Sequence, residues 1–413
     1  MKIAVIGAGI SGMLAAYLLH DEHDVTVFEA NDYIGGHTNT IDVRIGDRTY
    51  AVDTGFIVFN QKTYPNFVKL LQRLKVPWQK SNMSFSVHCE KTGFEYSPTS
   101  ISTLFAQRGN ILRPWFWNMI REVFAFRKQL EHTAELDENI TLDSYLSDKG
   151  YSKKFTDYFI IPMGAAIWSA NPEVFKDFPA RMFARFFLNH GFLNVHDQPQ
   201  WLVIQGGSRE YVKALTKSFR DCIRINCCID QIKRFSDRVE VTKSDGNLER
   251  FDHVIIATHS NQALKMLADP TEAEREVLGA IPYQKNEVVL HTDITMLPKR
   301  RRIWSSWNYF IPSELNAKVV LTYNMNILQS LESESEFCVT LNQKQNIDAS
   351  KIKKNLEYAH PVYQPRTLIA QHRYQEISGI NRTHYCGAYW GNGFHEDGVK
   401  SALAACNYFG KSL

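Results

Sequence analysis

The first residues of the chain carry a glycine pattern that could hold the phosphates of a nucleotide. Gly7, Gly9 and Gly12 follow a short apolar run, 2–6, in the spacing Gly-x-Gly-x-x-Gly, and an apolar segment, 13–19, comes next. In this spacing the first glycine makes a tight turn, the second lets the backbone approach a pyrophosphate, and the third lets a helix pack closely on a strand. The free N–H groups at the start of that helix attract negative phosphates.

An acidic residue at a suitable distance strengthens this interpretation. Glu29 ends the second apolar run, 24–28, about 20 residues after the glycines, where a carboxylate can accept hydrogen bonds from ribose hydroxyls. A purely structural glycine turn would not need an acid at this spacing. Strand, glycine loop, helix, strand and acid together predict a Rossmann-type dinucleotide-binding fold.

The residues that follow resemble the flavin-containing amine oxidase superfamily, which also includes protoporphyrinogen oxidases and carotenoid-type desaturases. Gly35 and Gly36 form a second glycine pair just after the acid. Superfamily members usually continue with Arg, whereas this chain has His37, which can still donate a hydrogen bond. Segment 52–55 resembles the strand and glycine turn near the flavin. The resemblance implies that the chain binds FAD.

Later blocks of the chain resemble the same superfamily. A strand expected over 223–232 contains Ile229, which matches the position whose backbone reads the adenine, and 251–258 resembles a buried strand that ends near the cofactor. After the strand and turn 385–389, a last helix is expected to start at Gly398, and in the superfamily its N-terminus stabilises negative charge on the reduced flavin. The cofactor-binding residues that the resemblance implies are Gly7, Gly9, Ile10, Ser11, Gly12, Glu29, Ala30, Gly35, Gly36, His37, Thr54, Gly55, Phe56, Ile229, Ala257, Gly387, Gly398 and Val399.

A narrower resemblance exists within the superfamily. Segments 53–58, 165–169, 304–309 and 393–398 are similar to a bacterial group described only as predicted NAD/FAD-binding proteins or FAD-dependent amine oxidoreductase-like proteins. These strings are spread over the whole length of the chain. Because the group's description is general, this resemblance indicates the fold far better than the substrate.

The length and the spread of these blocks predict the domain organisation. A chain of 413 residues exceeds what one ordinary core holds. We expect an FAD-binding domain from 1–60, 200–268 and 376–413, and a substrate-binding domain from 61–199 and 269–375. The predicted fold class is α/β, with α+β character overall: a Rossmann-type FAD-binding domain with an interleaved, amine-oxidase-like substrate domain.

Charge and cysteine usage limit the partners and the compartment. The formal net charge of +3 gives no case for nucleic-acid binding. Seven cysteines without a CxxC pair predict reduced thiols in the cytoplasm and no metal site. No apolar run is long enough to span a membrane. Cys386, in an apolar run, reads as a small buried hydrophobe rather than a flavin tether, so FAD is expected to be non-covalent.

Two departures separate this chain from the amine oxidases it resembles. Many of them carry a Lys beside the flavin where this chain has Glu287; Lys285 would share a strand face with Glu287 and is the candidate replacement. His395 stands where amine oxidases often place a cage tyrosine, next to Glu396. The candidate catalytic residues are therefore His395, Glu396 and Lys285. Capping and packing are the alternative for this cluster, with Asp397 as a plain N-cap.

The first insert is rich in aromatic and basic residues. Over 104–130, apolar residues recur at helical spacing with cations between them, and Pro114 suits the first turn of a helix. This pattern is typical of a core helix with snorkelling arginines, or of a helix that lies on a membrane surface and admits an acyl or isoprenoid substrate. The basic run 299–302 is either a solvated loop or a contact for an anionic substrate or lipid headgroup.

These patterns together favour an FAD-dependent oxidoreductase that moves hydride from a substrate C–H bond to flavin N5. The leading substrate class is a lipid-like or unsaturated small molecule, reached with or without peripheral membrane contact. Oxidation of an amine is the second candidate. A flavin-binding partner protein without turnover of its own is the third, and the oligomeric state has no signal in the sequence.

Overall fold

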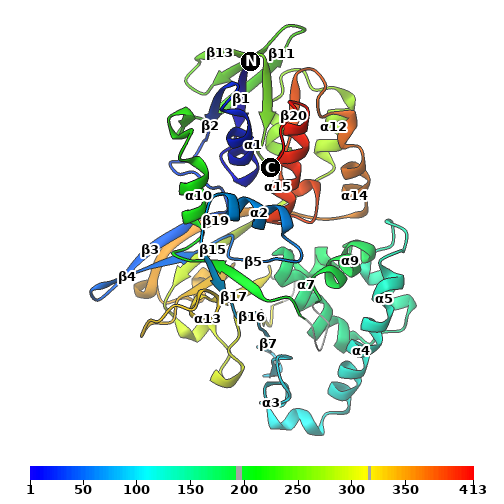
Figure 1. Ribbon diagram of the computed structural model, residues 1–413. Helices are drawn as coiled ribbons and strands as arrows, with labels where there is room; N and C mark the ends of the chain where they lie inside the picture. Colours follow the sequence, from blue (N-terminus) through cyan, green and yellow to red (C-terminus); the bar gives the residue numbers. More distant parts are fainter. Residues whose placement is uncertain (192–197, 315–317) are drawn as a thin grey trace.

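The computed structural model describes residues 1–191, 198–314 and 318–413 (Figure 1). Its upper part in that view is built on a five-stranded parallel sheet. In spatial order the strands are β10 (Ile223–Arg224), β2 (Asp24–Phe28), β1 (Lys2–Ile6), β14 (His253–Ile256) and β20 (Thr383–Tyr385). The strands come from three separate stretches of the chain, which this sheet joins side by side.

Both faces of this sheet are covered, which explains its nearly continuous apolar strands. Ile3 and Val5 point to one face, where they pack with helices α1 (Ile10–Leu19) and α15 (His395–Asn407). Ala4 and Ile6 point to the other face, toward a three-stranded antiparallel sheet. That sheet consists of β11 (Ile229–Arg234), β12 (Val239–Lys243) and β13 (Leu248–Phe251).

Two sequence expectations need correction in this region. The predicted strand over 223–232 is broken into β10 and β11, because Asn226 takes a left-handed conformation with φ of +52° between them. The last helix begins at His395 rather than at Gly398. The carboxylate of Asp397 accepts the backbone N–H of Phe394, which stabilises a helix start one turn earlier than the glycine suggested.

A seven-stranded mixed sheet lies below the parallel sheet in Figure 1. All its neighbouring strands are antiparallel except β16 and β7, which run parallel. In spatial order the strands are β19 (Ile352–Pro361), β15 (Tyr283–His291), β18 (Cys338–Leu341), β17 (Val320–Asn324), β16 (Trp307–Ile311), β7 (Phe85–Cys89) and β8 (Glu95–Tyr96).

A group of helices from the first insert packs beside this sheet around an aromatic core. Helix α4 (Pro114–Thr133) begins at Pro114, as the sequence predicted, and buries the face that carries Phe116, Met119 and Phe126. The aromatic residues of the insert therefore form a packed core. The other helices of the group are α3 (Ile101–Leu104), α5 (Leu142–Asp148), α6 (Lys153–Phe155), α7 (Ile161–Trp168), α8 (Pro172–Phe175) and α9 (Ala180–His190).

Shorter elements connect these parts. The remaining strands are β3 (Thr40–Ile45), β4 (Arg48–Asp53), β5 (Val58–Asn60), β6 (Trp78–Lys80) and β9 (Trp201–Ile204). The remaining helices are α2 (Pro65–Arg73), α10 (Arg209–Thr216), α11 (Ser260–Met266), α12 (Glu272–Gly279), α13 (Met325–Gln329) and α14 (Pro365–His372). Within the described ranges, none of the helices has the length and apolar character needed to cross a bilayer.

Candidate cofactor and substrate site

The glycine loop lies between the end of β1 and the start of α1. Gly7 has φ of +100°, a conformation that favours glycine, and its N–H donates to Phe28 O at 2.7 Å. A Cβ on Gly12 would collide with the carbonyl oxygen of Gly7, so this glycine permits the close approach of α1 to β1. A Cβ on Gly9 would meet no described atom within 4 Å. The space beside Gly9 is therefore open where a pyrophosphate would approach the backbone.

Glu29 lies directly beside this loop and is buried. Its Oε2 accepts the N–H of Ala8 at 2.8 Å, and its Oε1 accepts the backbone N–H of Asn31 at 2.9 Å. The N–H of Cys227 donates to Glu29 O at 2.8 Å, which brings the segment leading to Ile229 next to the acid. Because a carboxylate oxygen has two lone pairs, Oε2 can also accept a ribose hydroxyl.

The second glycine pair closes over the loop. Gly35 donates its N–H to Ala8 O at 2.8 Å, and a Cβ on Gly36 would lie 3.3 Å from the Cα of Gly9. Both residues have positive φ, +126° and +60°. The next residue, His37, accepts the N–H of Phe56 at 2.8 Å through its carbonyl oxygen. The segment containing Thr54, Gly55 and Phe56 is thus anchored to the glycine pair.

His37 is half-buried, and its Nε2 is a buried atom that has no hydrogen-bond partner within the described part of the chain. Burial lowers its pKa to about 4, so the ring is neutral at the position where the resemblance implied an arginine. A buried polar atom without a partner carries a desolvation cost that a ligand can remove. An open space at Gly9, a free lone pair on Glu29 and this nitrogen together fit an elongated cofactor with phosphates and ribose.

The rings around His37 were not identified from the sequence. Tyr358, His360 and His259 have ring centroids 4.9, 5.3 and 6.1 Å from that of His37. Burial, and then the neighbouring histidines, lower the pKa of His360 to about 3 and that of His259 to about 4. Tyr358 and His360 alternate along β19, so strand periodicity could have placed them on one face.

The N-terminal turns of α1 and α15 meet at Gly398. A Cβ on Gly398 would lie 2.8 Å from Ile10 Cγ2 and 3.0 Å from Ser11 Oγ, and the Ser11 hydroxyl donates to Gly398 O at 2.9 Å. Val399 is fully buried beside this contact. Two helix N-termini in one place create a positive potential that favours an anionic ligand. On the strand side, the N–H of Gly387 donates to Ser401 Oγ at 2.8 Å, which ties the 385–389 turn to α15.

His395 begins α15 and is buried in a compact polar and aromatic contact. Its Nε2 lies 2.9 Å from Thr38 Oγ1 and 3.0 Å from the Tyr211 hydroxyl. Its ring stacks on Phe56 with a centroid distance of 3.5 Å. Burial holds the pKa of His395 well below its usual range. The ring is therefore neutral, and it is held between Phe56 on one side and Tyr211 of α10 on the other.

Glu396 is directed to the start of α2. Its Oε1 accepts from the backbone and side chain of Asn66 at 3.2 and 2.7 Å, and its Oε2 accepts the N–H of Phe67 at 2.9 Å. These bonds satisfy N–H groups that a helix start leaves without an intrahelical partner. Glu396 thus caps α2 from another helix, and its catalytic role stays a prediction.

Lys285 lies on the outer face of β15. Its side chain is 73% exposed and forms an ion pair with Glu357 at 2.8 Å. The opposite face of the strand carries Asn286, which is fully buried and lies 3.0 Å from His360 Nδ1 through its amide nitrogen. The structure therefore joins Asn286, rather than Lys285, to the histidine cluster beside the glycine loop. The catalytic role of Lys285 stays a prediction.

A cavity of about 240 Å³ opens at the starts of α2 and α15. Its wall includes cations, amides, aromatic rings and the two carboxylates that follow His395. Burial raises the pKa of one of them, Asp397, to about 6. The lining residues are Lys62, Thr63, Tyr64, Pro65, Asn189, His190, Asn392, Phe394, Glu396, Asp397 and Lys400.

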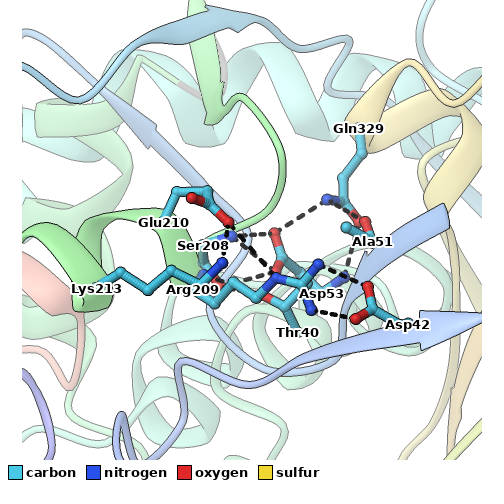
Figure 2. Close-up of polar contacts among 9 residues, drawn as sticks. All are labelled: Thr40, Asp42, Ala51, Asp53, Ser208, Arg209, Glu210, Lys213 and Gln329. Carbon is cyan, nitrogen blue, oxygen red and sulfur yellow. Dashed lines mark hydrogen bonds and ion pairs between the residues drawn. The ribbon is translucent and has the colours of Figure 1, made fainter. Parts of the chain in front are cut away.

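A buried acid ties the glycine-turn segment to the rest of the site (Figure 2). Asp53 accepts from Thr40 Oγ1 at 2.5 Å, from the N–H of Ser208 at 2.9 Å and from Gln329 Nε2 at 3.0 Å. Burial raises the pKa of Asp53 to about 6 despite these bonds. A Cβ on Gly207 would lie 2.6 Å from Thr40 Cγ2, so glycine at position 207 permits this close packing. Thr54 follows Asp53 directly and is thereby held in place.

The chain is similar to known proteins in sequence and in structure. Residues 10–292 match the family model for flavin containing amine oxidoreductases. A flavin-dependent L-tryptophan oxidase from Lentzea aerocolonigenes is 27% identical over 285 residues, covering 62% of this chain and 57% of that protein. A 4,4'-diapophytoene desaturase from Staphylococcus aureus strain bovine RF122 / ET3-1 is 24% identical over 295 residues, covering 62% of this chain and 54% of that protein.

The same architecture occurs in a solved structure. The cyclohexylamine oxidase from Brevibacterium oxydans IH-35A superposes with a TM-score of 0.70, covering 99% of both chains at 15% identity. At that identity the likeness concerns the fold. The aligned region spans about half the length of the curated relatives in sequence, at 57% and 54%.

Proposed function

The chain belongs to the family of flavin-containing amine oxidoreductases, and from that premise we propose that it is an oxidoreductase whose bound FAD supplies a hydride acceptor for a substrate C–H bond. Membership confirms the predicted α/β fold with a Rossmann-type cofactor domain, and FAD as the cofactor. The observation that carries the proposal is the open space beside Gly9, which Gly36 approaches. Glu29, bonded to the neighbouring Ala8, and the His37 Nε2, which has no partner among the described residues, support it.

The residues of the chain divide the work of binding and orientation. The glycine loop admits the phosphates, and Glu29 accepts ribose hydroxyls. The starts of α1 and α15, which touch at Gly398, stabilise negative charge on a bound ligand. His37 offers a neutral hydrogen-bonding nitrogen, because burial of the ring lowers its pKa to about 4. These roles amount to positioning and electrostatics, without a strong base.

We propose a lipid-like or unsaturated molecule as the substrate. One relative is named as a desaturase of 4,4'-diapophytoene, and a desaturation removes hydrogen from carbon. Amine oxidation is the second candidate, supported by the family description and by the tryptophan oxidase relative. Two features disfavour amine oxidation. Lys285 forms an ion pair on the surface, and position 287 is Glu, so neither position supplies the inward lysine that the resemblance to amine oxidases implied. A flavin-binding partner without turnover is the third candidate.

Anaerobic mixing separates these three functions. The purified holoprotein is combined, without oxygen, with monounsaturated acyl lipids and in parallel with primary and secondary amines. We expect the visible flavin absorbance to fall with a lipid and to stay unchanged with the amines. Bleaching by amines alone would establish the second candidate. If neither the lipids nor the amines bleach the flavin, although a chemical reductant does, the third candidate, a flavin-binding partner without turnover, would be supported.

His395 offers a sharper test of how the site works. We propose that it positions Phe56, Thr38 and Tyr211, since it is neutral and enclosed. His395→Ala should slow substrate-driven flavin reduction by about 10- to 100-fold through misplacement, with the FAD content unchanged. His395→Gln, which keeps a hydrogen-bonding group, should recover part of the rate.

The pH profile distinguishes positioning from proton transfer. We expect His395→Ala to lower the rate equally at all pH values, while the exposed-residue control Glu376→Gln leaves both rate and profile as in the wild type. A profile that loses one limb in His395→Ala would assign a proton-transfer role instead. Release of FAD by both His395 variants would make the residue a part of cofactor binding.

We propose that the protein works in a reducing compartment such as the cytoplasm. All seven cysteines are free thiols, which supports this location.

We also propose that 1–60, 200–268 and 376–413 form the FAD-binding domain, with 61–199 and 269–375 forming the substrate domain. The substrate class and the exposed apolar residues of the first insert support peripheral contact with a membrane.

A further inference from the structure

Helix α4 has an exposed face that combines aromatic and cationic side chains. Trp117, Arg121, Phe124 and Lys128 follow one another at spacings of four, three and four residues, so they share one face of the helix. Trp117 is 49% exposed and Phe124 is 50% exposed. The opposite face is buried in the aromatic core, which fixes the orientation of the helix. Large apolar side chains are therefore presented to solvent by a rigid element.

The segment before α4 extends this face. Ile101 in α3 is 80% exposed and Leu112, at the end of a short 3-10 helix, is 85% exposed. Trp117 Nε1 donates to Ile111 O at 2.9 Å, and its ring centroid lies 5.1 Å from that of Phe105. Figure 1 places α3 and the start of α4 at the end of the molecule opposite β13. We call this region the α3–α4 surface; it comprises Ile101, Ile111, Leu112, Trp117, Arg121, Phe124 and Lys128.

Cations outnumber acids around the α3–α4 surface. Between residues 98 and 129 the chain has five cations, which are Arg108, Arg113, Arg121, Arg127 and Lys128. The single acid of this stretch, Glu122, is buried and accepts from the N–H and the hydroxyl of Ser152 at 2.8 and 2.6 Å. It therefore faces the interior of the protein. The exposed Glu131 follows Lys128 by three residues and is the acid that α4 adds to this face. The solvent side therefore combines apolar residues with an excess of positive charge.

A second basic segment lies next to this stretch. Arg300 forms an ion pair with Glu95, whose backbone N–H donates to Gln107 Oε1 at 3.1 Å. Gln107 precedes the 3-10 helix that carries Leu112. The ion pair of Arg300 and Glu95 therefore holds this basic segment next to the α3–α4 surface. Its neighbours are the exposed cations Lys299, Arg301 and Arg302. Residues from two distant parts of the chain contribute positive charge to one end of the molecule.

We propose that the α3–α4 surface docks on a membrane leaflet that contains anionic lipids. Apolar side chains on a rigid helix can enter the headgroup region while the surrounding cations pair with lipid phosphates. A second copy of the chain is a poorer occupant, because a two-fold contact would place the same cations against each other. The inference rests on the proposed lipid-like substrate, since docking would bring the substrate domain to the phase in which such molecules reside.

Vesicle co-sedimentation of the holoprotein tests the proposal. The probes are vesicles of phosphatidylcholine alone and of equal parts phosphatidylcholine and phosphatidylglycerol. We expect binding to the mixed vesicles, weaker binding to the neutral ones, and loss of the difference at high salt. The variant Trp117→Ser, Phe124→Ser should reduce partitioning at least about tenfold. The variant Arg121→Gln, Lys128→Gln should reduce it by about fivefold for each cation removed.

Control variants and a second assay complete the design. Ile225→Ser, Leu248→Ser removes two exposed apolar residues elsewhere on the molecule and should bind as the wild type does. Three results would overturn the proposal. They are no vesicle binding by the wild type, equal binding by all variants, and self-association of the protein that Trp117→Ser abolishes. A water-soluble, short-chain acyl substrate is assayed without vesicles. Flavin reduction by it without vesicle binding would refute docking alone, whereas binding without reduction by any acyl lipid would refute the substrate class alone.

Discussion

Replacing Gly9 with Val is expected to give a folded protein that has lost most of its affinity for FAD. Gly9 has φ of −75° and ψ of −179°, which Val adopts readily, and a Cβ there meets no described atom within 4 Å. The free protein therefore accommodates the side chain. The same side chain would occupy the space in which the backbone must approach a pyrophosphate. We expect FAD affinity to fall about 100-fold, with the unfolding midpoint of the cofactor-free protein unchanged.

Two further substitutions make this result specific. Gly109→Val places the same side chain at another glycine that has open space around it, and should change neither FAD affinity nor stability. Gly12→Val should impair both, because its Cβ collides with the Gly7 carbonyl oxygen and α1 must move. FAD titration of the cofactor-free proteins and chemical unfolding measure the two quantities. Unaltered FAD affinity in Gly9→Val would show that the cofactor does not use this loop.

The second large effect is loss of stability in acid. Burial is the first cause of the lowered pKa in a group of histidines. The pKa falls to about 4 in His37, His88, His190, His259, His291 and His384, to about 3 in His360, and well below the usual range in His395. In the unfolded chain these groups titrate near 6.5.

The sign of the effect follows from proton binding. Below about pH 6.5 the unfolded chain binds protons that the folded protein excludes, so the free energy of unfolding falls as the pH decreases. A histidine shifted from 6.5 to about 4 contributes up to about 3 kcal/mol. Asp53 and Asp397, whose pKa values are raised to about 6, act in the opposite direction between about pH 4 and pH 6 but are fewer. We expect cooperative acid unfolding between about pH 6 and pH 4.

A single histidine allows a matched experiment. His88 Nδ1 is buried without a partner among the described residues, and its ring packs on Phe310, so Phe can replace it. Urea unfolding of His88→Phe should show a higher midpoint than the wild type, with a larger difference at pH 5 than at pH 7. The exposed control His132→Gln should follow the wild type at both pH values. A stability that rises on acidification of the wild type would contradict the sign.

The glycine loop and α4 could be predicted because their determinants are local. Gly7, Gly9 and Gly12 act within one turn, and Pro114 favours the first turn of a helix. The sequence prediction placed the start of α15 at Gly398, but the helix begins at His395. The carboxylate of Asp397 accepts the N–H of Phe394, and this contact stabilises the earlier start. All three features are set by residues close together in the sequence; for α15 the determining residue was Asp397 and not Gly398.

Contacts between distant segments could not be read from the sequence. Glu396 caps α2 from more than 300 residues away in the chain, and no local spacing announces that pairing. Strand periodicity placed Lys285 and Glu287 on one face of β15, yet it could not tell which face points inward. The side that faces the histidine cluster carries Asn286. The inward face depends on how β15 and its partner strand β19 pack toward His37, which is a property of the folded chain.

The visible spectrum of the purified protein, taken before and after heat denaturation, tests the central claim most directly. The account predicts flavin absorption bands in the native protein and their transfer to the supernatant after the protein precipitates. Cys386 is fully buried and its pKa is raised well above the usual range by burial, which disfavours a thiol tether. Flavin that stays on the precipitate would contradict non-covalent binding. A protein that shows no flavin bands, even after incubation with FAD, would contradict the claim that this chain is a flavoprotein.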